Sequence, residues 1–114
     1  MTFDSFDVVT VPFPFTDRKQ SKRRPAVVLS ERGFYNDAVG HVVLAMITSA
    51  NNSPWPVDVK IQDLKQAGIR AESVVRMKLF TLDERLILQV IGKLARVDRQ
   101  AVQKTFARVF GDIL

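Results

Sequence analysis

The chain has 114 residues, a formal charge of +5 and no cysteine. This length fits one domain, residues 1–114, with a packed core, and the lack of cysteine excludes disulfides, thiolate metal sites and cysteine nucleophiles. The longest apolar run, Val42 to Ile47, is far shorter than the ~20 residues of a membrane helix. The acidic N-terminus also differs from a secretion signal, so we expect a cytoplasmic protein. The positive charge favours a polyanionic partner such as nucleic acid.

Apolar or alternating patterns, bounded by proline, glycine and asparagine, predict a series of short strands. These strands are expected over residues 6–12, 26–29, 41–48, 57–61, 74–81 and 88–95. Between them we expect a polar, basic loop over 15–23, connections over 33–40 and 51–56, one helical turn over 63–68, and a turn over 82–85.

Only the C-terminus is expected to form a long helix. Asp98 has the side chain of a good N-cap. The apolar residues after it recur at helical spacing on one face: Val102, Phe106, Val109, Phe110 and Ile113. We expect this face to pack against the strands, and the alternative is a docking face for a partner. Many short strands followed by one amphipathic helix predict a small, mainly β, strongly curved barrel.

The most informative stretch is a basic run that leads into a buried strand. Five cations fall within seven residues: Arg18, Lys19, Lys22, Arg23 and Arg24. Pro25 follows, and proline holds the preceding residue in extended geometry. Arg24 is therefore expected at the mouth of the strand over 26–29. A guanidinium on a rigid element binds phosphate well through paired donors; the alternative is that Arg24 is only a solubilising charge.

This stretch, with three other segments, resembles the MazF/PemK family of toxin–antitoxin endoribonucleases. Residues 6–13 (FDVVTVPF) are similar to that family's first strand, and residues 24–30 (RPAVVLS) to its second. Residues 46–49 (MITS) resemble the end of its third strand. Residues 73–76 (SVVR) resemble the strand that carries an active-site arginine in the PemK-type branch. The resemblance covers nearly the whole chain and implies an SH3-like barrel, similar to MazF and CcdB, that forms homodimers.

Two positions depart from the family pattern. The family usually has Gly-Asp where this chain has Phe6-Asp7. The PemK-type branch can carry an aspartate two residues after its strand arginine, where this chain has Lys78. A mechanism that needs that carboxylate is therefore open to question in this chain.

The resemblance implies a metal-independent endoribonuclease without a cofactor, in which the 2'-hydroxyl attacks the adjacent phosphate and leaves a cyclic phosphate. Arg24 is expected to stabilise the charge on the scissile phosphate, because an arginine holds its proton too tightly to serve easily as a base. Thr48, with Ser49 as its substitute, is expected to bind a phosphate oxygen or orient the 2'-hydroxyl. Arg76 is expected to share the catalytic load, and Asp17 is the carboxylate near the basic loop that could act as base.

Single-stranded RNA is bound by cations along its backbone and by aromatic rings that stack on its bases. The candidate cations are Lys19, Lys22, Arg23 and Lys78. Trp55, between two prolines, is the best stacking candidate, and its alternative role is a packing plug over the barrel. The sole histidine, His41, begins an apolar strand, where a structural role is expected. No metal-ligand spacing is present.

The resemblance also implies a cognate antitoxin that lays an acidic, disordered tail over the basic surface. Two other functions stay open: a CcdB-like toxin that binds gyrase without catalysis, and a catalytically silent RNA-binding barrel. The matches at Arg24 and Thr48 favour the nuclease, because a gyrase binder needs neither residue.

Overall fold

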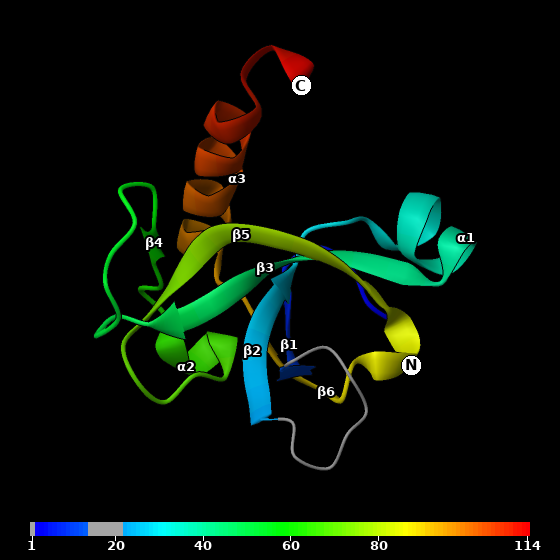
Figure 1. Cartoon of the computed structure of the whole chain (residues 1–114), viewed down its shortest axis with the longest axis horizontal. Helices are drawn as coiled ribbons and strands as arrows, with labels where there is room; N and C mark the ends of the chain where they lie inside the picture. Colours follow the sequence, from blue (N-terminus) through cyan, green and yellow to red (C-terminus); the bar gives the residue numbers. More distant parts are fainter. Residues whose placement is uncertain (1, 14–21) are drawn as a thin grey trace.

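The computed structural model describes residues 2–13 and 22–114 of the chain. Within these ranges, six strands form one antiparallel sheet in the order β4-β5-β3-β2-β1-β6. The strands are β1 (Asp7–Phe13), β2 (Lys22–Val28), β3 (His41–Ser49), β4 (Val59–Lys60), β5 (Ser73–Asp83) and β6 (Gln89–Lys93). The sheet curls into a half-barrel from which one long helix projects (Figure 1). The mainly β, strongly curved fold expected from the sequence is therefore confirmed.

The helical segments are short except for the last. They are η1 (Arg32–Asn36), α1 (Asp37–Val39), α2 (Leu64–Ala67), η2 (Glu84–Leu86), α3 (Arg96–Phe110) and η3 (Gly111–Ile113). The helical turn expected over 63–68 is confirmed as α2, with the Asp63 side chain accepting a hydrogen bond from the Gln66 amide and Gly68 ending the helix in a left-handed conformation.

Each predicted strand is present, with different bounds. β2 begins at Lys22 rather than at residue 26, so the last residues of the expected loop, and Arg24 with them, lie within a strand. β4 is only Val59–Lys60 and so is shorter than the alternating pattern suggested. The segment 33–40 was expected as a plain connection but forms η1 and α1, because Glu31 caps η1 by accepting hydrogen bonds from the amides of Gly33 and Phe34.

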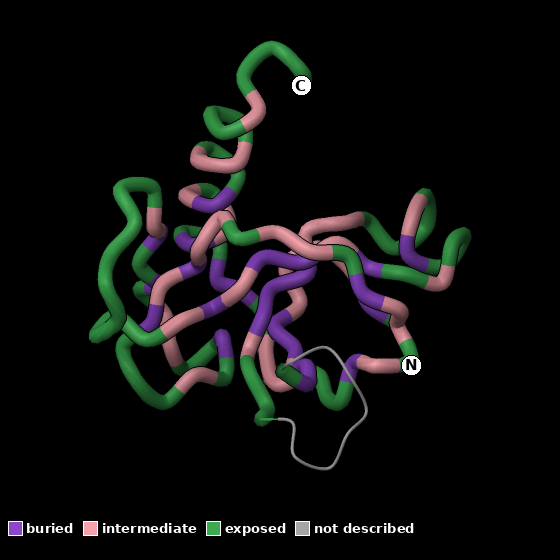
Figure 2. Tube along the Cα trace, in the orientation of Figure 1, coloured by how far each residue is buried: buried purple, intermediate pink, exposed green. Residues whose placement is uncertain are grey.

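Two expectations for the C-terminal helix are corrected. Asp98 does not cap α3, which begins at Arg96; it is buried in the first turn and accepts hydrogen bonds from the backbone amides of Gln62 and Asp63. The apolar face packs on the sheet only near the start of the helix, where Val102 is buried. Further along, Val109 is 46 % exposed and Ile113 79 % exposed, since the helix extends beyond the half-barrel (Figure 2).

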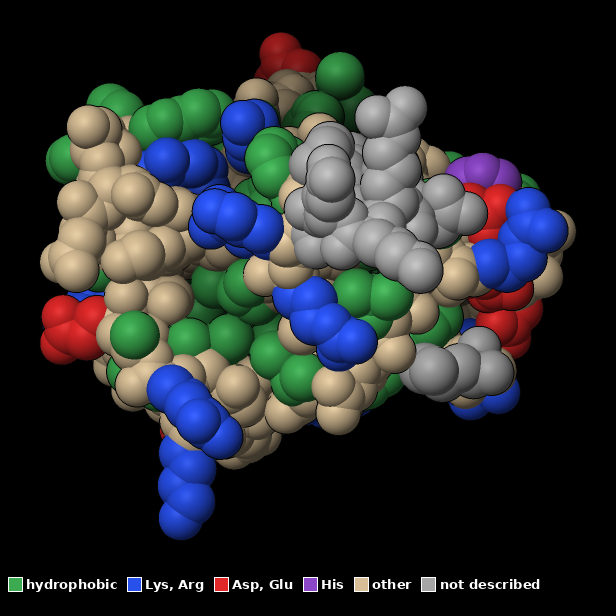
Figure 3. Space-filling view, turned by 60° about the horizontal axis from the view of Figure 1, so that its bottom comes forward, with side chains coloured by type: hydrophobic (Ala, Val, Ile, Leu, Met, Phe, Trp, Pro, Cys, Tyr) green, Lys and Arg blue, Asp and Glu red, His purple; other side chains and the backbone are tan. Residues whose placement is uncertain are grey.

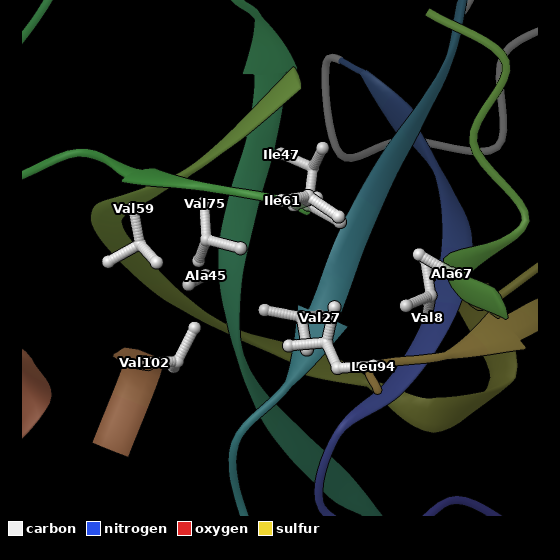
Figure 4. Close-up of a cluster of buried hydrophobic side chains, with 10 residues drawn as sticks. All are labelled: Val8, Val27, Ala45, Ile47, Val59, Ile61, Ala67, Val75, Leu94 and Val102. Carbon is white, nitrogen blue, oxygen red and sulfur yellow. The ribbon is translucent and has the colours of Figure 1, made fainter. Parts of the chain in front are cut away.

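The core lies on both faces of the sheet. One cluster fills the concave space under α2 and the first turns of α3 (Figure 4): Val8, Val27, Ala45, Ile47, Val59, Ile61, Ala67, Val75, Leu94 and Val102. The second cluster lies on the other face and includes Val9, Ala26, Val28 and Leu44. Neighbouring residues of one strand thus enter opposite clusters, which explains why residues 26–29 are apolar at every position rather than at alternate positions.

The end of α2 lies directly against β6. A Cβ atom at Gly92 would be 2.4 Å from the carbonyl carbon and oxygen of Ala67, and one at Gly68 would be 2.0 Å from the carbonyl oxygen of Ile91. Only glycine permits two backbones to approach this closely. The close contact holds α2 under the sheet.

We therefore expect Gly92→Ala to lower the free energy of unfolding by about 3 kcal/mol, because the new methyl group meets backbone that cannot move aside. Gly40→Ala is the matched control. Its Cβ meets open space and only its positive φ of 69° is unfavourable, so we expect a loss of about 1 kcal/mol. Urea unfolding of the two variants measures both values, and equal losses would contradict this account of the contact.

Candidate functional site

A cavity of about 200 Å³ opens where β2 separates from β3. The β2–β3 ladder pairs Val28, Val27 and Ala26 with Leu44, Ala45 and Met46, and it goes no further. The Leu29 amide, just after β2, donates a hydrogen bond to the Val43 carbonyl of β3. Because the amides of successive residues in a strand point to opposite sides, the odd-numbered residues of β2 direct their amides toward β3. Pro25 occupies the next such position and has no amide hydrogen. The two strands therefore diverge beyond this point (Figure 1).

The ladder's register places Arg24 opposite Thr48 across the gap. Because the two strands are antiparallel, two residues back along β2 correspond to two residues forward along β3. The next pair on the same face of the sheet after Ala26–Met46 would therefore be Arg24–Thr48. β5 adds Arg76 directly opposite Met46, next to a bulge where the β3–β5 register shifts. Bulges commonly redirect side chains beside functional sites. The cavity is lined by Phe13, Arg24, Met46, Ile47, Thr48, Asn52, Arg76 and Lys78.

The predicted pair Arg24 and Thr48 is thus brought together. Arg24 is exposed, and no carboxylate in the described part of the chain forms an ion pair with it. Thr48 is half-buried, and its Oγ1 accepts a 2.6 Å hydrogen bond from the side-chain amide of Asn52. Because the hydroxyl accepts from Asn52, its own proton is left to donate to a further acceptor in the cavity.

Arg76, by contrast, is firmly held. Its Nε donates to Asp58 Oδ1 at 3.0 Å and its Nη2 to Asp58 Oδ2 at 2.9 Å, and Nη2 also donates to the Ser53 carbonyl at 2.8 Å. The Arg76 and Asp58 side chains are only 12 % and 10 % exposed. The hydrogen bonds from Arg76 lower the pKa of Asp58, and the carboxylate in turn raises the pKa of Arg76. A paired, bidentate geometry of this kind fixes the plane of a guanidinium.

Trp55 covers this ion pair. Its ring lies 5.0 Å from the Arg76 guanidinium, in the range of a cation–π contact, and its backbone amide donates to Asp58 Oδ2. Trp55 does not line the cavity, and the residue is 42 % exposed. The ring therefore has one face on Arg76, and it is not a plug in the barrel.

The remaining predicted residues fall into three groups. Lys22, Arg23 and Lys78 are exposed, and basic side chains surround a hollow with an apolar floor on the side of the molecule where β2 begins (Figure 3). Ser49 is exposed and is not part of the cavity lining. Asp17 and Lys19 lie outside the described residues.

His41 begins β3 and Thr48 lies near its other end, and His41 Nδ1 contacts the Val39 carbonyl. Over residues 2–13 and 22–114, no three histidine, aspartate or glutamate side chains gather in a way that could hold a metal ion.

Sequence reasoning missed Asn52 and Asp58. Asn52 stood in a run of loop-forming residues, and Asp58 stood at a polar position of an alternating segment, so neither pattern indicated a contact with the site. Lys78 replaces the carboxylate that the resemblance led us to consider near Arg76, and Asp58 supplies a carboxylate to that arginine from another part of the chain.

A family model described as PemK-like, MazF-like toxins of type II toxin–antitoxin systems matches residues 4–110. The chain belongs to this family.

Solved structures of similar fold include a MazE–MazF complex from Deinococcus radiodurans, with 22 % identity and a TM-score of 0.76 over 97 % of this chain and 98 % of that chain. An endoribonuclease in complex with its cognate antitoxin, from a mycobacterial species, has 14 % identity and a TM-score of 0.73 over 96 % and 94 % of the chains. A MazF toxin of Mycobacterium tuberculosis has 19 % identity and a TM-score of 0.70 over 91 % and 95 %. At these identities the likeness shows the fold.

No curated protein sequence matches the chain. None of the helices in the described ranges is long and apolar enough to cross a membrane.

The ion pair predicts a pH dependence of stability. Because the pKa of Asp58 is below its ordinary value of 3.8 in the folded chain, its charge stabilises the fold fully above that value, and the contribution is lost as the pH falls below it. The difference in unfolding free energy between wild type and Asp58→Asn should therefore be largest at neutral pH and shrink in acid. Urea unfolding from pH 7 to pH 2 measures it. Asp112→Asn, at an exposed position, should change the unfolding free energy by no more than about 0.5 kcal/mol.

Proposed function

We propose that the protein is an endoribonuclease toxin that cleaves single-stranded RNA without a metal ion. The observation that carries this proposal is the shared cavity of Arg24, Thr48 and Arg76, in which Arg24 forms no ion pair with a described carboxylate. Membership of the toxin family and an endoribonuclease of the same fold support it.

The reaction uses the substrate's own nucleophile. The 2'-hydroxyl gives up its proton as its oxygen attacks the neighbouring phosphorus. The bond from phosphorus to the 5'-oxygen breaks and that oxygen takes up a proton from water, so the products are a cyclic phosphate and a free 5'-hydroxyl. Negative charge grows on the two non-bridging phosphate oxygens in the transition state. Arg24 donates to one of these oxygens, and Arg76 offers its Nη1 group, since its Nε and Nη2 are taken by Asp58 and Ser53. Donors that are already oriented stabilise such charge without reorganising.

Thr48 donates its hydroxyl proton to a phosphate oxygen or to the 2'-oxygen, because the hydrogen bond from Asn52 uses a lone pair of the hydroxyl and leaves its proton free. The cavity lining contains no carboxylate and no histidine among the described residues. Asp17 is therefore kept as the candidate base, although it lies outside those residues.

The substrate is proposed to bind as an extended single strand. Lys22, Arg23 and Lys78 follow the phosphates, as Lys19 would, and the exposed part of the Trp55 ring stacks on a base. Ser49 contacts the strand beside the cavity rather than within it. The cavity volume of about 200 Å³ suits one nucleotide linkage rather than a duplex.

The proposed partners are a second copy of the chain and a cognate antitoxin with an acidic, disordered tail. The complexes of two proteins of this fold with antitoxins support the second partner, and a net charge of +5 attracts an acidic segment. We place the protein in the cytoplasm, where its RNA substrate lies.

One experiment tests the activity. The purified chain is incubated, with EDTA present, on a labelled RNA and on its all-deoxy equivalent. Cleavage of RNA alone, with a cyclic phosphate end, supports the proposal because only RNA carries the 2'-hydroxyl. Binding without cleavage would reject it in favour of a silent RNA-binding barrel, and inhibited gyrase supercoiling with intact RNA would reject it in favour of a gyrase binder.

Arg24→Ala should reduce the rate of RNA cleavage by about 10²–10³-fold, the usual effect of removing one preorganised donor. Thr48→Ala should have a smaller effect, about 10²-fold or less, because a neutral hydroxyl is a weaker donor to phosphate than a guanidinium. Single-turnover cleavage measures both. Arg32→Ala removes the same charge from an exposed arginine outside the cavity lining and should leave the rate unchanged; a wild-type rate for Arg24→Ala would remove Arg24 from the mechanism.

Lys78→Ala should weaken RNA binding by the same factor for all sequences. If Lys78 neutralises one phosphate, its loss should reduce the slope of log affinity against log salt by about 0.7. The affinity is measured with an uncleavable 2'-O-methyl RNA across a salt series. Lys104→Ala, on the projecting part of α3, is the control and should keep the wild-type slope; an unchanged slope for Lys78→Ala would place this lysine away from the bound strand.

A further inference from the structure

One loop contacts two of the three residues to which the proposed chemistry is assigned. The loop of residues 50–58 connects β3 to β4 and passes beside the cavity. Near its start, Asn52 donates to the Thr48 hydroxyl. At its end, Asp58 accepts two hydrogen bonds from Arg76, and between them the Ser53 carbonyl accepts a third.

The contact with Arg76 leaves a defined part of the guanidinium for a ligand. Asp58 binds the edge made by Nε and Nη2, and no described residue accepts a hydrogen bond from Nη1. Arg76 is at the same time part of the cavity lining. A carboxylate that accepts two hydrogen bonds from one edge of a guanidinium fixes the plane of the group, so the Nη1 group on the other side has a fixed orientation.

The loop is itself held in shape by short-range hydrogen bonds. The Trp55 amide donates to Asp58 Oδ2 at 2.8 Å, and the Asp58 amide donates to the Trp55 carbonyl at 3.1 Å. At the other end, the Asn52 amide donates to the Ser49 carbonyl at 3.1 Å. Asp58 is therefore fixed before any ligand arrives, which is the condition for orienting another side chain.

We propose that the loop of residues 50–58 is the positioning element of the site, with Asp58 orienting Arg76 and Asn52 orienting Thr48 toward one phosphate. This inference rests on the proposed function and extends it: Asp58 and Asn52 act through other residues and are positioning residues. If the ion pair only stabilised the fold, its loss would lower the free energy of unfolding without lowering the rate of cleavage.

A double-mutant cycle separates these two roles. Asp58→Asn should lower kcat by at least about 10-fold, but by less than the 10²–10³-fold loss expected when a whole donor is removed. KM should change by no more than about 3-fold, because the positive charge of Arg76 remains. In the Arg76→Ala background, Asp58→Asn should have no further effect, since there is no guanidinium left to orient. Equal effects in the two backgrounds would overturn the inference, as would a wild-type kcat for Asp58→Asn.

The chain offers a matched control for this cycle. Asp83 grips the Nε and Nη2 atoms of Arg85 with the same two-atom geometry, at the far end of β5 and outside the cavity lining. Asp83→Asn should leave kcat unchanged. Asp58→Glu keeps a carboxylate and should recover part of the rate.

If Asp58→Asn does not fold, Asn52→Ala tests the inference instead. It should lower kcat in the wild-type background and have no effect on kcat in the Thr48→Ala background. An equal effect in both backgrounds would overturn the inference.

A second measurement does not require cleavage. The Arg76 Nε–H resonance should be protected from solvent exchange in wild type and should shift when an all-deoxy oligonucleotide is added; Asp58→Asn should lose both properties. A wild type that cleaves no RNA but shows both would reject the proposed function and keep the positioning role. A protected resonance that ignores the oligonucleotide would reject the positioning role. Fluorescence of Trp55, the chain's single tryptophan, reports separately on whether the loop stays in place.

Discussion

The site depends on the absence of one backbone hydrogen bond between β2 and β3, the bond that Pro25 cannot donate. Pro25 lies in β2 at a position whose amide would bond to β3, and it has no amide hydrogen. The ladder therefore ends at Ala26–Met46, and the strands separate beyond it. Arg24 and Thr48, which would form the next pair on the same face, line the cavity between the separated strands. An unbroken β2–β3 ladder would close this gap with backbone hydrogen bonds.

The two arginines of the cavity have different environments, and in the proposed reaction this difference gives them different electrostatic roles. Arg24 is exposed on a strand and forms no ion pair with a carboxylate of the described residues. Arg76 is held on three sides, by Asp58, the Ser53 carbonyl and the Trp55 ring. The Arg76 guanidinium has a fixed orientation, whereas the Arg24 guanidinium has a positive charge that no described carboxylate neutralises. Together they suit a phosphate whose charge rises during a reaction.

The strands were predictable from sequence because burial on either sheet face leaves a local pattern. The errors concern side chains whose partners are distant in sequence. Asp98 has the chemistry of an N-cap, yet it accepts from Gln62 and Asp63, which lie in a different segment. The segment 33–40 was expected as a connection, yet it forms η1 and α1, and Asn36 there donates to the carbonyl of Phe3, which is distant in sequence. Arg24 and Thr48 could be named because they lie in segments that resemble strands of the family. Asp58, whose partner Arg76 lies in β5, and Asn52, which stood in a run of loop-forming residues, could not.

The two departures from the family pattern have different consequences. Phe6 has a φ of 72°, which costs a residue with a side chain about 1–2 kcal/mol and costs glycine almost nothing. Its amide and carbonyl bond to Val28 and Leu94, so the backbone needs this bend whichever residue is present, and the Phe6 side chain offsets the cost by packing on the core. Lys78, in contrast, removes a carboxylate from the strand of Arg76. With Asp58 as its partner, that arginine is held by the loop of residues 50–58 rather than by its own strand.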